Sequence, residues 1–439
     1  MSFRRELGPF DATMVVIGGI IGSGIFINPY LVAQRLDSPG LVLAAWAAGG
    51  AVAIAGAFAY AELARLLPRA GGQYVFLREA WHPLVGFLYG WALLLLIETG
   101  AIAAVAITFA TYTLRLFDAG PVSPQPLAIA TIVVLSAINC LGVKPGSRVL
   151  NVLVVLKVAA LGVLILFAWF QAAHPGWLSI GRVDDSPTTP LSFGASLIPI
   201  LFAYGGWQVS TYIAEEMRNP ERDLPRSLIL GTLTVVAIYL LVNVAFLRTL
   251  GLEGLAATTT PAADTASRWM GDGAGKFVAA AIAISTLGFL HLSVLAPARV
   301  YFAMAADGAF PAAVAKLHPR YRTPIVAILL QSAWAIALAL TGSYETLLNT
   351  VVFADWIFFG LTVAGLFVLR RRLGVSREHA TPGYPWVPAL FVLVAAIVVF
   401  STLREAPQRS AVGAGLLLLG VPVYYFFKSR SGRGGDRRP

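Results

Sequence analysis

Two apolar segments of the chain are interrupted by small residues that could expose backbone groups for binding. Residues 18–26 read GGIIGSGIF, and residues 202–207 read FAYGGW. Each glycine inside a helix costs about 1 kcal/mol relative to alanine. We therefore expect both helices to unwind at these points, although Gly18 and Gly22 could instead form a GxxxG packing face. A phosphate-binding loop is excluded, because no strand precedes the first run and no lysine follows it.

Unwound helices present two opposite kinds of backbone group. The half-helix that starts after Gly24 has free N–H groups and a positive dipole end, which suit a carboxylate, and the Ser23 hydroxyl adds a donor. The half-helices that end near Ile20 and Phe202 present free carbonyls, which suit an ammonium group. Matched interruptions in two halves of a membrane chain indicate the site of a secondary transporter. Together these groups predict a pocket for a zwitterion, namely a free α-amino acid.

Lys157 is the one cation that we assign to the interior of an apolar segment, because the others are assigned to the inner or outer side. It lies nine residues into segment 148–172, which is about 14 Å along a helix axis at 1.5 Å per residue. A lysine at the centre of a bilayer costs about 2.5–3.5 kcal/mol, and from that depth its stem is too short to reach the surface. We therefore expect a coupling role. If Lys157 stays charged, the carrier returns only when it is loaded with substrate, which favours exchange. If Lys157 releases its proton, it could carry that proton across, which favours proton symport.

Glu98, Asn139 and Asp355 also lie within apolar segments. Polar groups within membrane helices usually face the interior of the bundle and pair there, and structural pairing is our interpretation for all three. Asp355, next to Trp356, is also a candidate gate residue on the outer side. A cationic amino-acid or polyamine carrier would need acids along its pocket, so Asp355 is the residue that tests this alternative.

Glu215 and Glu216 follow the second interrupted segment, with Arg218 and Arg222 close by. Such a group of charges forms either a salt-bridge gate at the inner mouth or a solvated cluster. The sequence favours neither interpretation, and Glu215 is the candidate gate residue here.

The composition places these elements in a membrane. Of the 439 residues, 58% are hydrophobic and 12% are charged, whereas soluble domains carry about 25% charged residues. This excludes a water-soluble globule, and it excludes disorder, which needs low hydrophobicity. The single cysteine, Cys140, excludes an internal disulfide, and the five histidines are too scattered for a metal site. We expect no metal, no cofactor and no nucleic-acid partner, and no motif of a membrane-embedded enzyme is present.

Twelve apolar segments are candidate membrane spans, for each of which about 20 residues are needed. They cover residues 10–34, 40–67, 83–115, 125–143, 148–172, 191–214, 226–249, 275–306, 323–341, 346–370, 385–403 and 408–428. Backbone groups in lipid must be satisfied within each segment, so we expect helices and not barrel strands. The predicted fold is an all-α polytopic membrane protein.

Lysine and arginine residues predict the orientation. With the N-terminus inside, 23 of the 32 fall on inner segments and 8 on outer ones, with Lys157 the remaining one. This bias predicts that both termini are cytoplasmic. The predicted divisions are a cytoplasmic N-terminus (1–9), a first half of five spans (10–172), a second half of five spans (191–370), two further spans (385–428) and a disordered cytoplasmic tail (429–439).

The interrupted segments and three other stretches of the chain carry recognisable motifs. They are 22–26 (GSGIF), 202–207 (FAYGGW), 215–220 (EEMRNP), 68–74 (PRAGGQY) and 296–299 (APAR), in the expected order over nearly the whole chain. With them the sequence resembles the amino acid–polyamine–organocation superfamily, and within it the L-type amino acid transporters and their bacterial relatives. The resemblance implies a LeuT-like five-plus-five inverted repeat with helices 1 and 6 broken, followed by two extra helices.

The resemblance also implies roles for individual residues. Gly22, Ser23 and Gly24 would contact the substrate carboxylate, and Phe202 is similar to an aromatic that closes over bound substrate from outside. Lys157 sits where sodium-driven relatives hold an ion, so we expect sodium-independent transport. The ammonium group would contact the carbonyls of Ile20, Phe202 and Gly205. The full set of expected substrate-binding residues is Ile20, Gly22, Ser23, Gly24, Phe202, Ala203, Gly205, Gly206, Trp207 and Gln208.

Two departures from the family pattern matter. Loop 116–125 has no cysteine, so no disulfide-linked partner subunit is expected. Gln208 stands where related transporters often carry asparagine, which leaves side-chain specificity open. The sequence thus predicts a carrier of free, neutral L-amino acids in the cytoplasmic membrane, with exchange favoured over proton symport. A cationic or polyamine carrier and a non-transporting amino-acid sensor are the more distant alternatives.

Overall fold

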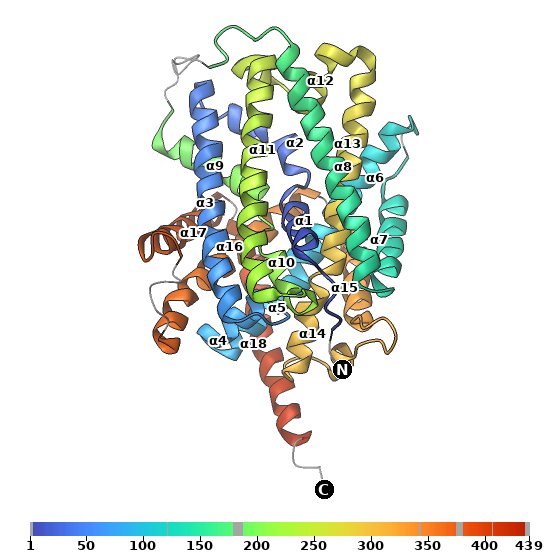
Figure 1. Ribbon diagram of the computed structural model, residues 1–439, viewed down its shortest axis with the longest axis vertical. Coiled ribbons are helices and arrows are strands. Elements are labelled where there is room, and N and C mark those ends of the chain that lie inside the picture. The colour runs from blue at the N-terminus through green and yellow to red at the C-terminus, as the bar shows by residue number, and fades with distance from the viewer. Residues whose placement is uncertain are drawn as a thin grey trace.

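The computed structural model describes residues 3–120, 122–178, 188–341, 344–374, 381–405 and 407–434. Over these residues the chain is helical, and its β-structure is limited to one isolated bridge between Leu7 and Met217. Most of the long helices run side by side along one direction (Figure 1). The predicted all-α architecture is confirmed for this part of the chain.

The helices of the first half follow one another with short connections. They are α1 (Pro9–Ile20), α2 (Gly24–Ala33), α3 (Pro39–Leu66), α4 (Gln73–Ala80), α5 (Pro83–Ala92), the π-helix η1 (Leu93–Ile97), α6 (Glu98–Leu116), α7 (Gln125–Cys140) and α8 (Val143–Phe170).

The remaining helices follow in the same manner. They are α9 (Pro190–Tyr204), α10 (Val209–Tyr212), η2 (Ala214–Glu216), α11 (Pro220–Ala257), α12 (Pro261–Met270), η3 (Gly271–Gly273), α13 (Ala274–Leu295), α14 (Ala298–Ala306), η4 (Ala312–Ala315), α15 (Ile325–Thr341), α16 (Tyr344–Leu373), α17 (Trp386–Glu405) and α18 (Pro407–Gly434).

Local signals in the sequence explain where helices begin. Ser38 caps α3 by accepting a hydrogen bond from the Leu41 N–H at 3.3 Å, and Pro39 follows it. Thr189 caps α9 by accepting from the Ser192 N–H at 3.1 Å. Proline suits the first helical position, because the N–H that it lacks has no partner there.

Seven of the described helices are long and apolar enough to cross a membrane, and the bent pair α1–α2 raises this number to eight. The other predicted spans correspond to α7, the pair α9–α10, α15 and α16. One predicted span, 275–306, is divided at Ala296–Pro297 into α13 and α14, because proline cannot donate the hydrogen bond that would continue the helix.

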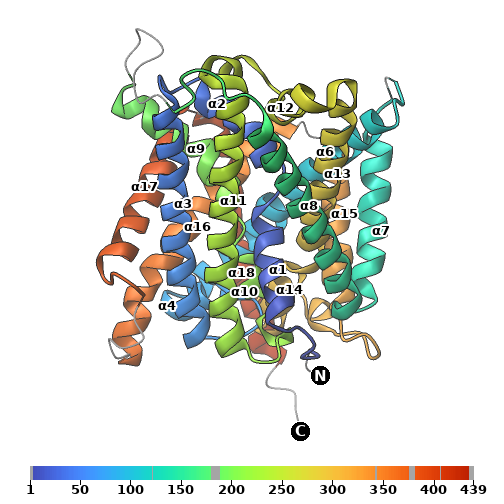
Figure 2. The same cartoon turned by 45° about the horizontal axis from the view of Figure 1, so that its top comes forward.

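Helix α1 lies inside the bundle. It packs against α8, α11 and α13, and both views show it between α11 and α8 (Figures 1 and 2). Helix α6 packs against α13 and α16, and α3 packs against α11 and α9. The broken segments are therefore surrounded by helices from both halves of the chain.

The first described residues and the end of α18 lie at the same end of the molecule, and α12 lies at the opposite end (Figure 1). The tail prediction is wrong for residues 429–434, because α18 continues to Gly434. Hydropathy reports where apolar residues stop, but a helix can continue beyond them because its backbone hydrogen bonds are internal. Residues 435–439 lie outside the described residues.

Candidate functional site

Both predicted helix interruptions are present. Helix α1 ends at Ile20 and α2 begins at Gly24, with a bend of 42° between them. Helix α9 ends at Tyr204, and α10 begins at Val209. The packing interpretation also holds in part, because a Cβ at Gly18 would lie 3.0 Å from a methyl group of Val154 in α8.

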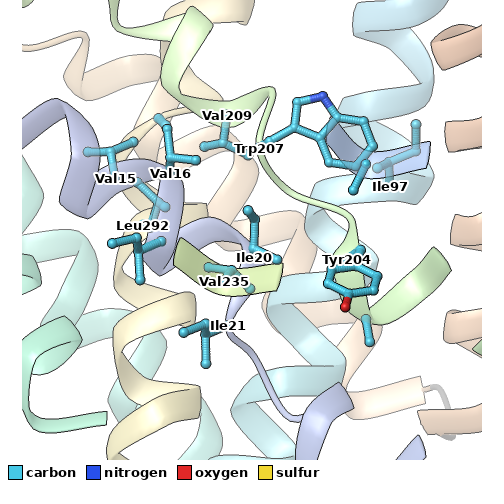
Figure 3. Close-up of a cluster of buried hydrophobic side chains, with 14 of the residues drawn as sticks. Val15, Val16, Ile20, Ile21, Ile97, Tyr204, Trp207, Val209, Val235 and Leu292 are labelled. Atoms are coloured by element: carbon cyan, nitrogen blue, oxygen red, sulfur yellow. The ribbon is translucent and has the colours of Figure 1, made fainter. Parts of the chain in front are cut away.

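The two interruptions touch each other. Gly206 has φ 112°, and a Cβ on it would overlap the carbonyl group of Gly19. Only glycine adopts that backbone conformation readily, so the close approach depends on this residue. Figure 3 shows Ile20 in a cluster of buried apolar side chains that includes Trp207, Val209 and Val235. The interrupted segments are thus held against each other by apolar packing.

A cavity of about 100 Å³ lies at these interruptions. Its wall includes nine of the ten predicted substrate-binding residues: Ile20, Gly22, Ser23, Gly24, Phe202, Ala203, Gly205, Gly206 and Gln208. Trp207 is the one that the wall does not include. Its side chain is 1% exposed and stacks on Phe359 with ring centroids 5.2 Å apart, so it supports the wall from behind.

The donor side of the cavity comes from the start of α2. Gly22, Ser23 and Gly24 line the cavity there, and the first N–H groups of a helix have no partner within it. Ser23 is the N-cap residue but makes no side-chain capping bond. The backbone N–H groups and the hydroxyl are therefore available to an anionic group, and the helix dipole favours one.

The carbonyl groups on the acceptor side of the cavity already accept hydrogen bonds from this chain, which the sequence did not indicate. The Tyr239 hydroxyl lies 3.2 Å from the Ile20 carbonyl oxygen and 3.3 Å from that of Ala203. The Phe202 carbonyl accepts from the Gly205 N–H at 3.2 Å. A carbonyl oxygen has two lone pairs, so each of these groups can still accept a second bond. Tyr239 was missed because it belongs to α11, far from both motifs in sequence.

Lys157 donates into the α1 interruption. Its Nζ lies 3.1 Å from the Gly18 carbonyl oxygen and 2.5 Å from that of Ile21, and the residue is fully buried. Ser285 Oγ donates to the Gly22 carbonyl at 3.0 Å. The carbonyl groups that face α8 and α13 are therefore bound by a lysine and a serine of this chain.

Two carboxylates line the same cavity, which the motifs did not indicate. Glu98 of α6 and Asp355 of α16 both belong to its wall. Within the described residues neither forms an ion pair, whereas Glu98 has a side-chain hydrogen bond with Ser293, so structural pairing of the two acids stays a prediction. For Asn139 the structural interpretation agrees with its hydrogen bond to the Leu135 carbonyl at 2.9 Å. The sequence showed that each acid lies within a span, but it did not show that the side chain points into the cavity.

The buried ion pair near the N-terminus differs from the predicted one. Glu216 receives bonds from Arg299 at 2.9 Å and 3.2 Å, and both side chains are almost fully buried. Arg218 and Arg222 are exposed, and Glu215 has no ion pair among the described residues. The Glu216 carbonyl also accepts from the Leu7 N–H at 2.9 Å. The ion pair at this end therefore belongs to Glu216, and the gating role of Glu215 stays a prediction.

A short helix closes the same end of the molecule. Tyr74 of α4 donates to Asp307 Oδ2 at 2.8 Å, and Arg78 also pairs with this carboxylate. Burial and the Asp307 charge raise the pKa of the Tyr74 hydroxyl above its ordinary value, so it remains a donor at neutral pH. Across the described residues, no group of three His, Cys, Asp or Glu side chains could hold a metal ion.

The chain is similar to known proteins along nearly its whole length. The model of the amino acid permease family matches residues 7–427. A serine/threonine exchanger of Bacillus subtilis (strain 168) is 32% identical over 432 residues, covering 97% of this chain and 98% of the relative.

Human relatives show the same extent of similarity. The large neutral amino acids transporter small subunit 2 is 30% identical over 435 residues, covering 97% of this chain and 81% of the relative. The cystine/glutamate transporter is 29% identical over 437 residues, covering 97% and 86%.

Proposed function

The chain belongs to the amino acid permease family, and on that premise we propose that it is a sodium-independent exchanger of small, neutral, free amino acids. Its family makes it an amino acid transporter of the membrane and not an enzyme. The observation that carries the proposal is the meeting of two interrupted helices at one cavity, with donors on one side and acceptors on the other.

The backbone of a free amino acid complements these groups. Its carboxylate would take the N–H groups of Gly22, Ser23 and Gly24 at the positive end of α2. Its ammonium would take the remaining lone pairs of carbonyls such as that of Ile20. This assignment needs no cofactor and makes the amino acid backbone the common element of every substrate.

The size of the cavity favours small side chains. It measures about 100 Å³, whereas pockets for drug-sized ligands measure about 300–1,000 Å³. Phe202, Phe289 and Trp356 contribute apolar side chains to its wall. We expect substrates of the size of alanine, serine and threonine, and the B. subtilis relative is named for serine and threonine.

Lys157 supports sodium independence and exchange. Its ammonium is bound to the carbonyls of Gly18 and Ile21, where a sodium ion would otherwise find its oxygen ligands. A charge held in that position without a co-transported ion favours a carrier that changes state only when loaded. Proton symport through Lys157 is the alternative, and it predicts net uptake driven by a proton gradient.

The proposed topology follows from the order of the helices. We take α1–α8 and α9–α16 as the two inverted repeats, and α17 and α18 as the two extra spans. The end that carries the N-terminus and the end of α18 would face the cytoplasm, as the lysine and arginine bias predicts. Cys140 is the one cysteine of the chain, and it lies at the same end of the molecule as the N-terminus, because Lys144 nearby bonds to Glu6. A disulfide to a partner subunit outside the cell is therefore not part of the proposal.

Proteoliposomes test the proposal directly. We expect labelled L-serine to enter vesicles preloaded with unlabelled serine at least ten times faster than empty vesicles. Neither sodium nor an inward proton gradient should change that rate. Entry into empty vesicles that rises with the proton gradient would replace exchange by symport, and absence of entry in both would overturn the proposed function.

A further inference from the structure

We propose that Glu98 and Asp355 form a cation subsite of the cavity, which binds the side-chain ammonium of a short diamino acid. The inference rests on the proposed function, because the α-amino and α-carboxyl groups of the same molecule must be held at the interrupted helices. It extends the substrates from neutral amino acids to small cationic ones.

Each of the two carboxylates has an oxygen without a hydrogen-bond partner among the described residues, although Glu98 also has a side-chain hydrogen bond with Ser293. Glu98 is 6% exposed, and its Oε2 has no hydrogen-bond partner among the described residues; the same holds for Oδ1 of Asp355. The two groups are close enough to interact electrostatically. Buried charges without partners are strongly unfavourable, so two of them on a cavity wall indicate a ligand that brings positive charge.

The helix that carries Glu98 is distorted directly before it. Residues 93–97 form the π-helix η1, which places one extra residue in the turn. Thr99 Oγ1 donates to the Leu94 carbonyl at 2.6 Å and so satisfies an acceptor in the widened turn. Such π-turns inside α-helices often occur at functional sites. This turn sets the direction in which Glu98 leaves α6.

The partner helix brings Asp355 to the same place. Helix α16 packs against both η1 and α6, and Asp355, Trp356 and Phe359 all line the cavity from it. The polar groups near the two acids are hydroxyls, which carry no charge. They belong to Tyr60, Tyr212, Tyr301 and Ser293. In the cavity wall, as far as the chain is described, no lysine or arginine accompanies the two acids.

The cavity volume limits the length of the ligand. About 100 Å³ leaves room for a side chain of one to three methylene groups between the helix breaks and the acids. Apolar wall residues such as Ile97, Val105 and Phe289 would contact those methylenes. L-2,4-diaminobutyrate is the suitable probe, and L-homoserine is its neutral isostere with a hydroxyl in place of the ammonium.

The test measures how each probe inhibits labelled L-serine exchange in proteoliposomes at pH 7. For the wild type we expect half-inhibition by diaminobutyrate at a concentration at least ten-fold below that of homoserine. Glu98→Gln and Asp355→Asn should each reduce this ratio at least five-fold. Glu253→Gln is the matched control, because Glu253 is exposed and lies outside this cavity, and it should leave the ratio unchanged.

A binding measurement keeps the test independent of transport in the variants. In thermal unfolding of the detergent-solubilised wild type, diaminobutyrate should raise the midpoint more than homoserine does at equal concentration. Equal effects of the two probes, together with normal serine exchange, would overturn the cation subsite and leave the proposed function intact. Absence of serine exchange in the wild type would instead count against the proposed function.

Discussion

Lys157 joins the α8 backbone to the unwound part of α1 through a single side chain. Replacing it by alanine removes the ammonium donor from the Gly18 and Ile21 carbonyls, of which that of Ile21 keeps only a contact of 3.5 Å with Ser285 Oγ, and an unsatisfied buried group costs about 1–3 kcal/mol. We expect Lys157→Ala to lower the rate of serine exchange at least ten-fold in proteoliposomes. Lys276→Ala is the control, because the Lys276 side chain is 61% exposed. Unchanged exchange in Lys157→Ala would remove this lysine from the coupling mechanism.

The Glu216–Arg299 pair is a second residue-scale feature, and its expected effect is on stability. Both side chains are almost fully buried, so removing one partner leaves an uncompensated buried charge, which costs about 3–5 kcal/mol. We expect Glu216→Ala to lower the thermal unfolding midpoint of the purified protein clearly. The Asp118–Lys276 pair is exposed, and Asp118→Ala should change the free energy of unfolding by less than about 1 kcal/mol.

At the scale of elements, the contact between the two interrupted helices depends on Gly206. Alanine at this position would combine a left-handed φ of 112° with an overlap on the Gly19 carbonyl. We expect Gly206→Ala to abolish exchange, because the interrupted segments must separate to accommodate the methyl group. Gly162→Ala provides the comparison, since Gly162 lies in α8 with no atom near its Cβ position. That change should be neutral or stabilise the helix by about 0.5–1 kcal/mol.

The elements also show how local chemistry limits prediction. The start of α3 at Pro39 could be predicted, because Ser38 and Pro39 are a local signal. The division between α13 and α14 follows from Pro297, yet apolar composition alone predicted one continuous span. The π-turn before Glu98 has no marker among the leucines of 93–96.

At the scale of the whole molecule, the orientation in the membrane can be measured with single cysteines. In a Cys140→Ser background, we expect Ser267→Cys of α12 to react with an impermeant maleimide in intact cells. Ser429→Cys, near the end of α18, should react only after the membrane is opened. Both positions are exposed. The opposite pattern of labelling would reverse the proposed orientation.

The sequence by itself determined the membrane class, the helical architecture and both interruptions, and it marked Lys157 as a cation within a helix. These follow from properties that lie along one segment, namely apolar length, the cost of internal glycines and distance along a helix axis. All ten expected substrate-binding residues lie in the two interrupted segments, and nine of them line the cavity.

Only the tertiary structure decided which side chains from other helices meet those segments. Position along a helix is a property of the sequence, but the rotation of a helix about its axis is set by its neighbours. That rotation directs Glu98 and Asp355 into the cavity and Tyr239 onto the carbonyls of the interruption, while packing on Phe359 holds Trp207 behind the wall. It also pairs Glu216 with Arg299, 83 residues away, in place of nearby arginines. Interactions between distant segments depend on packing, and so they could not be derived from local patterns.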